Sequence, residues 1–149
     1  MKIINRTYQR NYEELEKYEA GISLTGAEVK SIREGHMQLE DAYIKILDSG
    51  PVLLNAEISA YSHANAAGYN LRQSRKLLLN KKEILRLKTK IKSTPSLTIV
   101  PISCYNKGRR IKLEIALSKG RNDLAKRKLE KARDIKIATE KEIKEYQKY

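Results

Sequence analysis

Residues 107–120, KGRRIKLEIALSKG, contain the clearest β-strand of the chain. Every second residue from Ile111 to Leu117 is isoleucine or leucine. A period of two is typical of a strand that lays one face on a hydrophobic core. The other face of this strand carries Lys112, Glu114 and Ala116. The pattern therefore predicts that Lys112 points away from the core.

The segment before this strand predicts a partner for it. Apolar residues from Leu97 to Tyr105 mark a strand, in which Pro101 predicts an edge or a bulge because proline cannot donate a ladder hydrogen bond. Residues 106–108, Asn-Lys-Gly, then form a turn between the two strands. Further strands are predicted over residues 16–24, 43–47 and 52–56, the last two joined as a hairpin through DSGP at 48–51.

Two capping boxes predict helix starts. Thr25 is followed three residues later by Glu28, and Asn80 is followed by Glu83 at the same spacing. Gly35 suits the left-handed position just past the end of the first helix. The apolar side of the second helix carries Ile84, Leu87 and Ile91. Between the predicted hairpin and this second helix, residues 61–74 have no periodicity and predict a long loop.

These elements predict one mainly β domain with embedded helices over residues 1–120. Several short strands with glycine turns indicate a small antiparallel barrel, for which the oligonucleotide-binding (OB) fold is a natural form. Residues 121–149 differ, because they are rich in charge and contain neither glycine nor proline. Their apolar positions form no continuous stripe. We expect a basic tail that is disordered or fluctuating alone and helical on a partner.

Charge is the strongest indication of function. The chain has 31 lysines and arginines against 18 acidic residues, a formal net charge of +13, which favours an anionic partner such as nucleic acid. Between residues 72 and 92 nine cations stand against Glu83 alone, and Arg75 and Lys76 are among them. Tyr61 and Tyr69 lie in the preceding loop, where they are expected to stack on unpaired bases. Tyr43 and Tyr105, in strands, are expected in the core.

Other classes of protein fit less well. No apolar run approaches 18 residues, and the basic stretches lack tryptophan and phenylalanine, so no membrane partner is expected. The N-terminus resembles no secretory signal. A single cysteine, Cys104, with only His36 and His63 predicts neither a disulfide nor a metal site, and a reducing cytoplasm fits this. No catalytic residues are predicted, because His63 beside Ser62 lacks an orienting carboxylate, and no cofactor is expected.

Four strings carry a resemblance to a known family. They are YEAGISLTGAEVKSIREG (18–35), NAEISAYSHAN (55–65), SRKLLLNKKEI (74–84) and KGRRIKLEIALSKG (107–120). In order and spacing over residues 5–120 the chain resembles the SsrA-binding proteins, also called small protein B. The resemblance implies a six-stranded OB-like barrel with a basic C-terminal tail. It also implies binding to the tRNA-like domain of transfer-messenger RNA (tmRNA) and delivery of that RNA to stalled ribosomes for trans-translation.

The resemblance assigns roles to individual residues. Glu19, Leu78, Asn80 and Lys112 match RNA-binding positions of the family. From the residues alone Glu19 has two interpretations, an ion pair with a lysine or a hydrogen bond to a base edge, and the resemblance favours the RNA contact. The other expected RNA contacts are Arg75, Lys76, Tyr61 and His63. In the tail, the expected ribosome contacts, at the small-subunit decoding site and in the messenger channel, are Lys126, Arg127, Lys128, Lys131 and Arg133.

The sequence departs from the family pattern at two places, and it leaves two alternative functions open. Asn70-Leu71 stands where the family has Asp-Pro, and Ala125 stands where it has aspartate before Lys126-Arg127. Composition alone equally fits a general basic ribosome-associated protein or RNA chaperone of the same barrel class. An RNA-processing enzyme would need an acid-base pair or a metal cluster that the sequence does not present. A monomer is the simplest expectation.

Overall fold

The computed structural model describes residues 1–64 and 67–147. Its strands are β1 (Lys2–Ile4), β2 (Tyr12–Ile22), β3 (Met37–Gln38), β4 (Tyr43–Leu47), β5 (Gly50–Leu54), β6 (Glu57–Ile58), β7 (Arg75–Leu78), β8 (Leu97–Lys107) and β9 (Arg110–Gly120). Its helices are α1 (Tyr8–Asn11), α2 (Gly26–Arg33), α3 (Lys81–Ser93) and α4 (Asp123–Gln147). Residues 65 and 66 of the predicted loop and 148 and 149 of the predicted tail lie outside the described residues.

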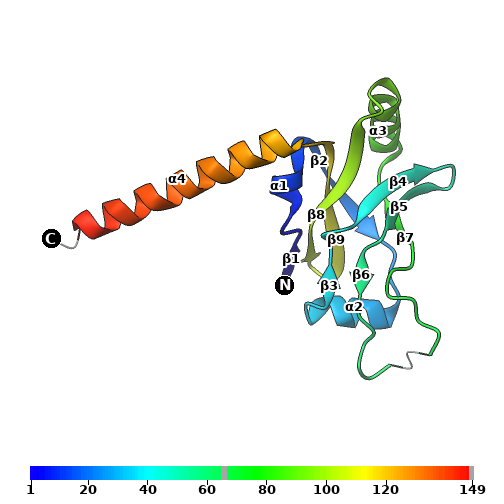
Figure 1. The fold of residues 1–149 in the computed structure, drawn as a ribbon. Helices are drawn as coiled ribbons and strands as arrows, with labels where there is room; N and C mark the ends of the chain where they lie inside the picture. Colours follow the sequence, from blue (N-terminus) through cyan, green and yellow to red (C-terminus); the bar gives the residue numbers. More distant parts are fainter. Residues whose placement is uncertain (65–66, 148–149) are drawn as a thin grey trace.

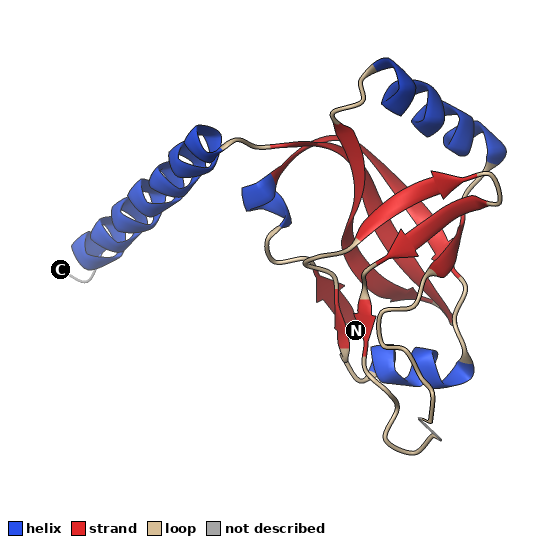
Figure 2. Ribbon diagram, turned by 45° about the vertical axis from the view of Figure 1, so that its right-hand side comes forward, coloured by secondary structure: helices blue, strands red, loops and turns tan. Residues whose placement is uncertain are grey.

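Six of the strands close into a barrel (Figures 1 and 2). Their order is β8-β4-β5-β7-β2-β9, and β9 pairs with β8 to complete the ring. All of these pairings are antiparallel. β1 adds to the outer edge of β8, while β3 and β6 form a separate two-stranded sheet. The predicted six-stranded antiparallel barrel with embedded helices is therefore confirmed.

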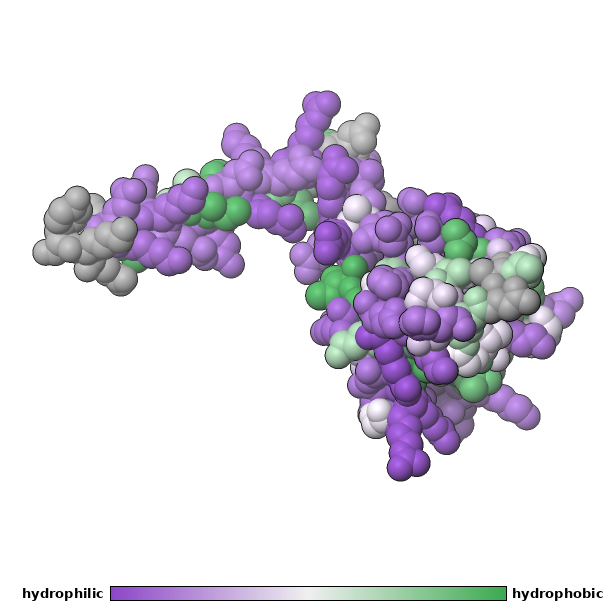
Figure 3. All heavy atoms as spheres, turned by 90° about the horizontal axis from the view of Figure 1, so that it is seen from below, coloured by the Kyte–Doolittle hydropathy of each residue, from purple (hydrophilic) through white to green (hydrophobic). Residues whose placement is uncertain are grey.

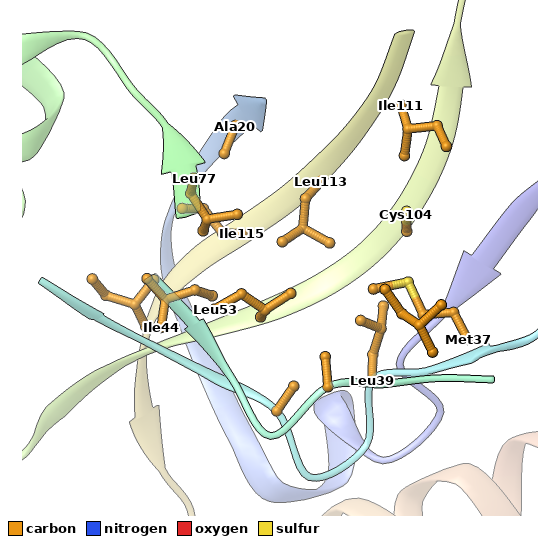
Figure 4. Close-up of a cluster of buried hydrophobic side chains, with 14 of the residues drawn as sticks. Ala20, Met37, Leu39, Ile44, Leu53, Leu77, Cys104, Ile111, Leu113 and Ile115 are labelled. Carbon is orange, nitrogen blue, oxygen red and sulfur yellow. The ribbon is translucent and has the colours of Figure 1, made fainter. Parts of the chain in front are cut away.

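The inward face of β9 is the one that the sequence predicts. Ile111, Leu113, Ile115 and Leu117 are buried, the least buried of them only 8% exposed. They meet apolar side chains from β2, β4, β5, β7 and β8 inside the barrel (Figure 4). Cys104 lies in the same core, and burial raises the pKa of its thiol to about 12, so that it stays protonated. Lys112 lies on the outer face, as predicted.

The outer side of the barrel has a second, smaller core. Tyr8 of α1 covers Val100 and Ala116, and its hydroxyl lies 2.6 Å from Oγ of the buried Ser118. Ala116 is therefore buried on the face of β9 that was expected to be exposed. The strand register shifts between Pro101 and Ser103, which confirms the bulge predicted at Pro101.

Three other expectations need correction. β2 spans Tyr12–Ile22 instead of the predicted 16–24. Its beginning was missed because a register shift between Glu14 and Glu16 disturbs the alternation there. Tyr43 is 44% exposed, since the inward position of β4 is taken by its neighbour Ile44. Tyr105 is half-buried at the outer surface, where its hydroxyl bonds to Glu19.

Both predicted helices form behind their caps. The Thr25 hydroxyl accepts from the backbone N–H of Glu28 at 3.2 Å, and the Glu28 carboxylate accepts from the backbone N–H of Thr25 at 3.1 Å. Gly35 follows α2 with a φ of 85°. At α3 the Glu83 carboxylate accepts from the backbone N–H of Asn80 at 3.1 Å.

The tail forms one helix, α4, that extends away from the barrel (Figure 1). Asn122 caps it by accepting the backbone N–H of Ala125 at 2.8 Å. Arg121, just before it, donates from Nε to the carbonyls of Gln9 and Tyr12, each at 3.1 Å. These contacts hold the start of α4 against α1. Within the described residues no helix is long and apolar enough to cross a membrane.

Candidate nucleic-acid interface

The outward faces of three neighbouring strands bring together four of the eight residues predicted to bind RNA, namely Glu19, Lys76, Leu78 and Lys112. β2 lies between β7 and β9, and Gly21 of β2 is in register with Leu78 on one side and Lys112 on the other. Glu19 lies two residues earlier on the same face, because alternate residues of a strand point the same way. We call Glu19, Gly21, Lys76, Leu78 and Lys112 the β2 face. It is a surface with one acid, two cations and one apolar side chain.

Glu19 is anionic and bound to a neighbouring cation. Tyr105 donates its hydroxyl to one carboxylate oxygen, and Lys107 lies 3.1 Å from the other. The Tyr105 hydroxyl, and then Lys107, hold the pKa of Glu19 below its usual range. Its side chain remains 37% exposed. A carboxylate has about four acceptor positions, so it retains the capacity to accept further hydrogen bonds from a ligand. The predicted ion pair thus exists and leaves room for an RNA contact.

Leu78 is the apolar member of the β2 face. It is 68% exposed, the most exposed large hydrophobic side chain among the described residues. Lys76 is exposed on the same strand, whereas Arg75 and Leu77 point inward and are buried. Asn80, exposed at the start of α3, follows directly. The four residues that match RNA-binding positions of the family by resemblance, Glu19, Leu78, Asn80 and Lys112, lie on neighbouring elements.

Arg75, although predicted to bind RNA, is not on the surface. Its side chain is 2% exposed, and its Nε lies 2.6 Å from the carboxylate of Glu28, itself 3% exposed. The remaining guanidinium nitrogens donate to the carbonyls of Ala56 and Leu71 and to the hydroxyl of Tyr69. Four of its five N–H donors are used inside the protein. Because the side chain is also buried, a phosphate cannot reach this group. We call Glu28, Tyr69 and Arg75 the Arg75 cluster.

The two tyrosines of the long loop that were expected to stack on bases have different surroundings. The hydroxyl of Tyr69 donates to the Ile58 carbonyl at 3.0 Å, and Tyr69 belongs to the Arg75 cluster. Tyr61 is half-buried, as Tyr69 is, and its ring centroid lies 5.3 Å from that of His63 in an edge-on contact. The ammonium of Lys30 lies 5.5 Å from the Tyr61 ring centroid. Tyr61 and His63 therefore form a group with α2, apart from the strands of the β2 face.

The basic face of α3 is partly neutralised by an acid that sequence reasoning did not single out. Glu16 of β2 accepts from Arg86 at 2.8 Å and from Lys90. Bonds from Arg86, then Lys90 and Tyr18, lower the pKa of its carboxyl to about 2. The cations of α3 outside this cluster include the exposed Lys81, Lys82, Lys88 and Lys92. The cluster ties α3 to β2.

The lowered pKa of Glu16 predicts an acid-dependent stability. A carboxyl with a folded-state pKa below its unfolded value stabilises the fold above the unfolded pKa, and this contribution is lost as the pH falls from about 4.5 to about 2. Glu16→Gln is expected to lower the free energy of unfolding by about 1 kcal/mol at pH 7, since Arg86 is exposed and solvent screens the pair. Urea titrations at pH 7 and pH 2 measure the difference, most of which should be lost at pH 2. Glu13→Gln, exposed on the same strand, is the control, and equal behaviour of both variants would contradict the assignment.

The tail residues predicted to contact the ribosome lie on α4, outside the barrel. Arg127, Lys128, Lys131 and Arg133 are exposed and Lys126 is half-buried. Seen from below, hydrophilic side chains cover most of the visible surface of α4 and of the barrel, and apolar atoms form only small separate patches (Figure 3). The charge is uneven along this segment. Residues 121–133 carry six cations and two acids, whereas residues 134–149 carry four of each.

Comparison with known proteins decides the family. The family model described as SmpB protein matches residues 2–145. The chain belongs to the SmpB family. An SsrA-binding protein of Sulfurihydrogenibium sp. (strain YO3AOP1) is 46% identical over 140 residues, which cover 94% of this chain and 91% of the relative. That of Malacoplasma penetrans (strain HF-2) is 40% identical over 142 residues, covering 95% and 97%.

A solved structure agrees with the SmpB assignment. A chain from the structure titled "tmRNA-SmpB: a journey to the center of the bacterial ribosome" is similar with a TM-score of 0.68 and 36% sequence identity. The similarity covers 82% of this chain and 85% of that one. The family resemblance predicted from the four strings is thus confirmed, as is the OB-like barrel expected of an SmpB protein.

Sequence reasoning missed three contributors to this surface. Lys107 was assigned only to a turn, yet it extends to Glu19 from the end of β8. Tyr105 was assigned to the core on the strength of its strand. Gly21 received no role, although a glycine in the interior of a strand signals a close approach of another group. For Gly21 the signal was therefore present in the sequence.

Proposed function

We propose that this chain binds the tRNA-like domain of tmRNA and delivers that RNA to stalled ribosomes for trans-translation. Membership of the SmpB family and the names of its relatives support the proposal. The observation that carries it is the β2 face, on which an anionic carboxylate, an exposed leucine and two lysines stand side by side. Lysines position the RNA backbone through its phosphates. The carboxylate and the leucine confer selectivity, because they contact base edges and sugars of the RNA.

The proposal divides the chain by function. Residues 1–120 hold the folded RNA through Glu19, Lys76, Leu78, Asn80 and Lys112, with Tyr61 and His63 as a further contact at the loop. Residues 121–149 contact the ribosome in the decoding site and the messenger channel through Lys126, Arg127, Lys128, Lys131 and Arg133. The protein acts by binding as a monomer in the cytoplasm, where ribosomes are, and performs no catalysis. Both groups of cations then meet phosphates, but on different RNAs.

The β2 face can be tested by removing one charge at a time. Glu19→Ala and Lys112→Ala are each expected to weaken binding to the tRNA-like domain about tenfold, because each removes a charged contact worth roughly 1–2 kcal/mol. Lys112→Ala should also reduce the salt dependence of binding, since one phosphate fewer is neutralised. Filter binding or fluorescence anisotropy across a potassium chloride series measures both effects.

Glu13 and Lys119 supply matched controls. They pair with each other in register near the other end of the same two strands and are exposed. Glu13→Ala and Lys119→Ala make the same chemical changes away from the β2 face, so Glu13→Ala should leave affinity unchanged and Lys119→Ala should cost at most the weak effect of one general cation. Unchanged affinity in both Glu19→Ala and Lys112→Ala would show that the RNA binds elsewhere.

A further inference from the structure

Gly21 occupies a position in β2 that its backbone does not require to be glycine. Among the described residues, the glycines with positive φ are Gly35, Gly50, Gly68 and Gly108, and Gly21 is not one of them. A glycine inside a strand weakens that strand, because it adds conformational entropy to the unfolded chain and contributes no side chain to packing. The reason for glycine here must therefore be space rather than backbone conformation.

The space above Gly21 is taken by Leu78. A Cβ added at Gly21 would lie 3.2 Å from the Leu78 Cβ and 3.4 Å from its Cδ1. The two residues are paired in register across β2 and β7. The Leu78 side chain thus lies against the strand at the glycine, although 68% of it remains exposed to solvent. An exposed leucine held in one place costs side-chain entropy and buries little, which favours a role in contacting a ligand.

The neighbours of this glycine complete a small surface. Lys112 is in register with Gly21 on the side opposite Leu78, and Glu19 is the previous outward residue of β2. Gly21 therefore lies between an apolar side chain and a cation, with a carboxylate on the same face of β2. These groups match the three parts of a nucleotide, because a sugar or base face packs on leucine, an amino group of a base bonds to a carboxylate, and a phosphate pairs with lysine.

We infer that Gly21 is a positioning residue, whose missing side chain lets Leu78 lie flat on β2 and, with Glu19 and Lys112, accept an unpaired nucleotide of the bound RNA. The inference rests on the proposed function and deepens it, since it assigns the kind of RNA element that the β2 face takes. Gly21 acts through Leu78 and makes no directed bond of its own.

Gly21→Ala tests the inference with Leu78→Ala as its partner in a double-mutant cycle. Each single change is expected to weaken binding to the tRNA-like domain about fivefold to tenfold, because part of one leucine contact is lost. The double variant should bind no more weakly than Leu78→Ala alone, since Gly21 has no effect once the leucine is gone. Gly26→Ala is the control, because a Cβ there meets nothing within 4 Å. Urea unfolding of each variant verifies that the barrel is intact at the binding temperature.

A second variant keeps the glycine in place, in case alanine at Gly21 disturbs the fold. Leu78→Ile preserves apolar area but moves the branch to Cβ, next to Gly21, where the side chain can no longer lie in the same way. It is expected to bind about threefold more weakly than the wild type, as a shape-dependent contact requires. Equal affinity in Leu78→Ile, equal affinity in Gly21→Ala, or losses that simply add in the double variant would each overturn the inference.

The same measurements separate this inference from the proposed function. If the wild-type protein binds the tRNA-like domain no better than an unrelated hairpin of equal length, the proposed function fails. If the wild-type protein is selective and Leu78→Ala weakens it, but Gly21→Ala does not, only the role of Gly21 fails.

Discussion

Removal of residues 121–149 is expected to abolish tagging of incomplete proteins on stalled ribosomes while leaving affinity for the tRNA-like domain within about threefold. The physical reason is separation. α4 extends away from the barrel, and its contacts to the domain are made near α1 rather than on the β2 face (Figure 1). A translation extract stalled on a messenger without a stop codon, supplied with tmRNA, measures tagging, and anisotropy measures affinity.

Two further variants sharpen the truncation. A chain ending at Asn122 retains Arg121, which bonds to Gln9 and Tyr12, and separates loss of the tail from damage at α1. Replacing Lys126, Arg127 and Lys128 by glutamine removes charge from the basic half of the tail, whereas replacing Lys136, Lys141 and Lys144 removes it from the balanced half. If phosphates are the partner, the first set should reduce tagging far more than the second. A large loss of affinity for the tRNA-like domain on truncation would contradict the division of labour between barrel and tail.

Among the single substitutions proposed, loss of the Arg75 side chain from the Arg75 cluster is expected to destabilise the fold most. Arg75→Ala would leave the Glu28 carboxylate buried without its cation, at a cost of about 3–5 kcal/mol in the free energy of unfolding. Burial raises the pKa of Glu28, yet the backbone N–H of Thr25 and the Arg75 guanidinium outweigh burial and hold it below its usual value. Equilibrium urea denaturation measures the loss.

The control for Arg75 is an arginine in a comparable ion pair at the surface. Arg72 lies 3.3 Å from Glu57, and its side chain is 51% exposed. Arg72→Ala should change the free energy of unfolding by only about 0.5 kcal/mol, because solvent screens exposed pairs. If Arg75→Ala unfolds at the same urea concentration as Arg72→Ala, Arg75 does not stabilise the loop and α2 as described. RNA affinity of folded Arg75→Ala protein should be nearly unchanged, since the guanidinium faces the interior.

The sequence predicts most of the barrel wherever one period governs a strand. From Ile111 to Leu117 alternation identifies the inward face correctly, and the capping residues at Thr25 and Asn80 locate two helices. Alternation indicates which face is buried but not which strand lies alongside, so the position of β2 between β7 and β9 could not be predicted from period alone. The early part of β2 is hidden for a second reason, the register shift between Glu14 and Glu16.

The candidate site was predictable to the extent that it lies on exposed, regular positions. Lys112 and Leu78 follow from strand alternation together with the family resemblance. Arg75 was misassigned because it was counted as one cation in a basic stretch, although it shares its strand face with the buried Leu77. Its partner Glu28 is distant in sequence, and no local sequence pattern indicates that Arg75 pairs with a buried carboxylate.

On the proposed function, the β2 face binds the tRNA-like domain of tmRNA selectively. Binding of the intact protein to that domain, to bulk tRNA and to a hairpin of equal length, each across a salt series, tests it most directly. General attraction of a protein with a net charge of +13 predicts equal affinities and one common salt slope for all three RNAs. We expect the tRNA-like domain to bind at least about a hundredfold more tightly than the hairpin at physiological salt, and Glu19→Ala to remove a large part of the difference. Equal affinities for the three RNAs would contradict it.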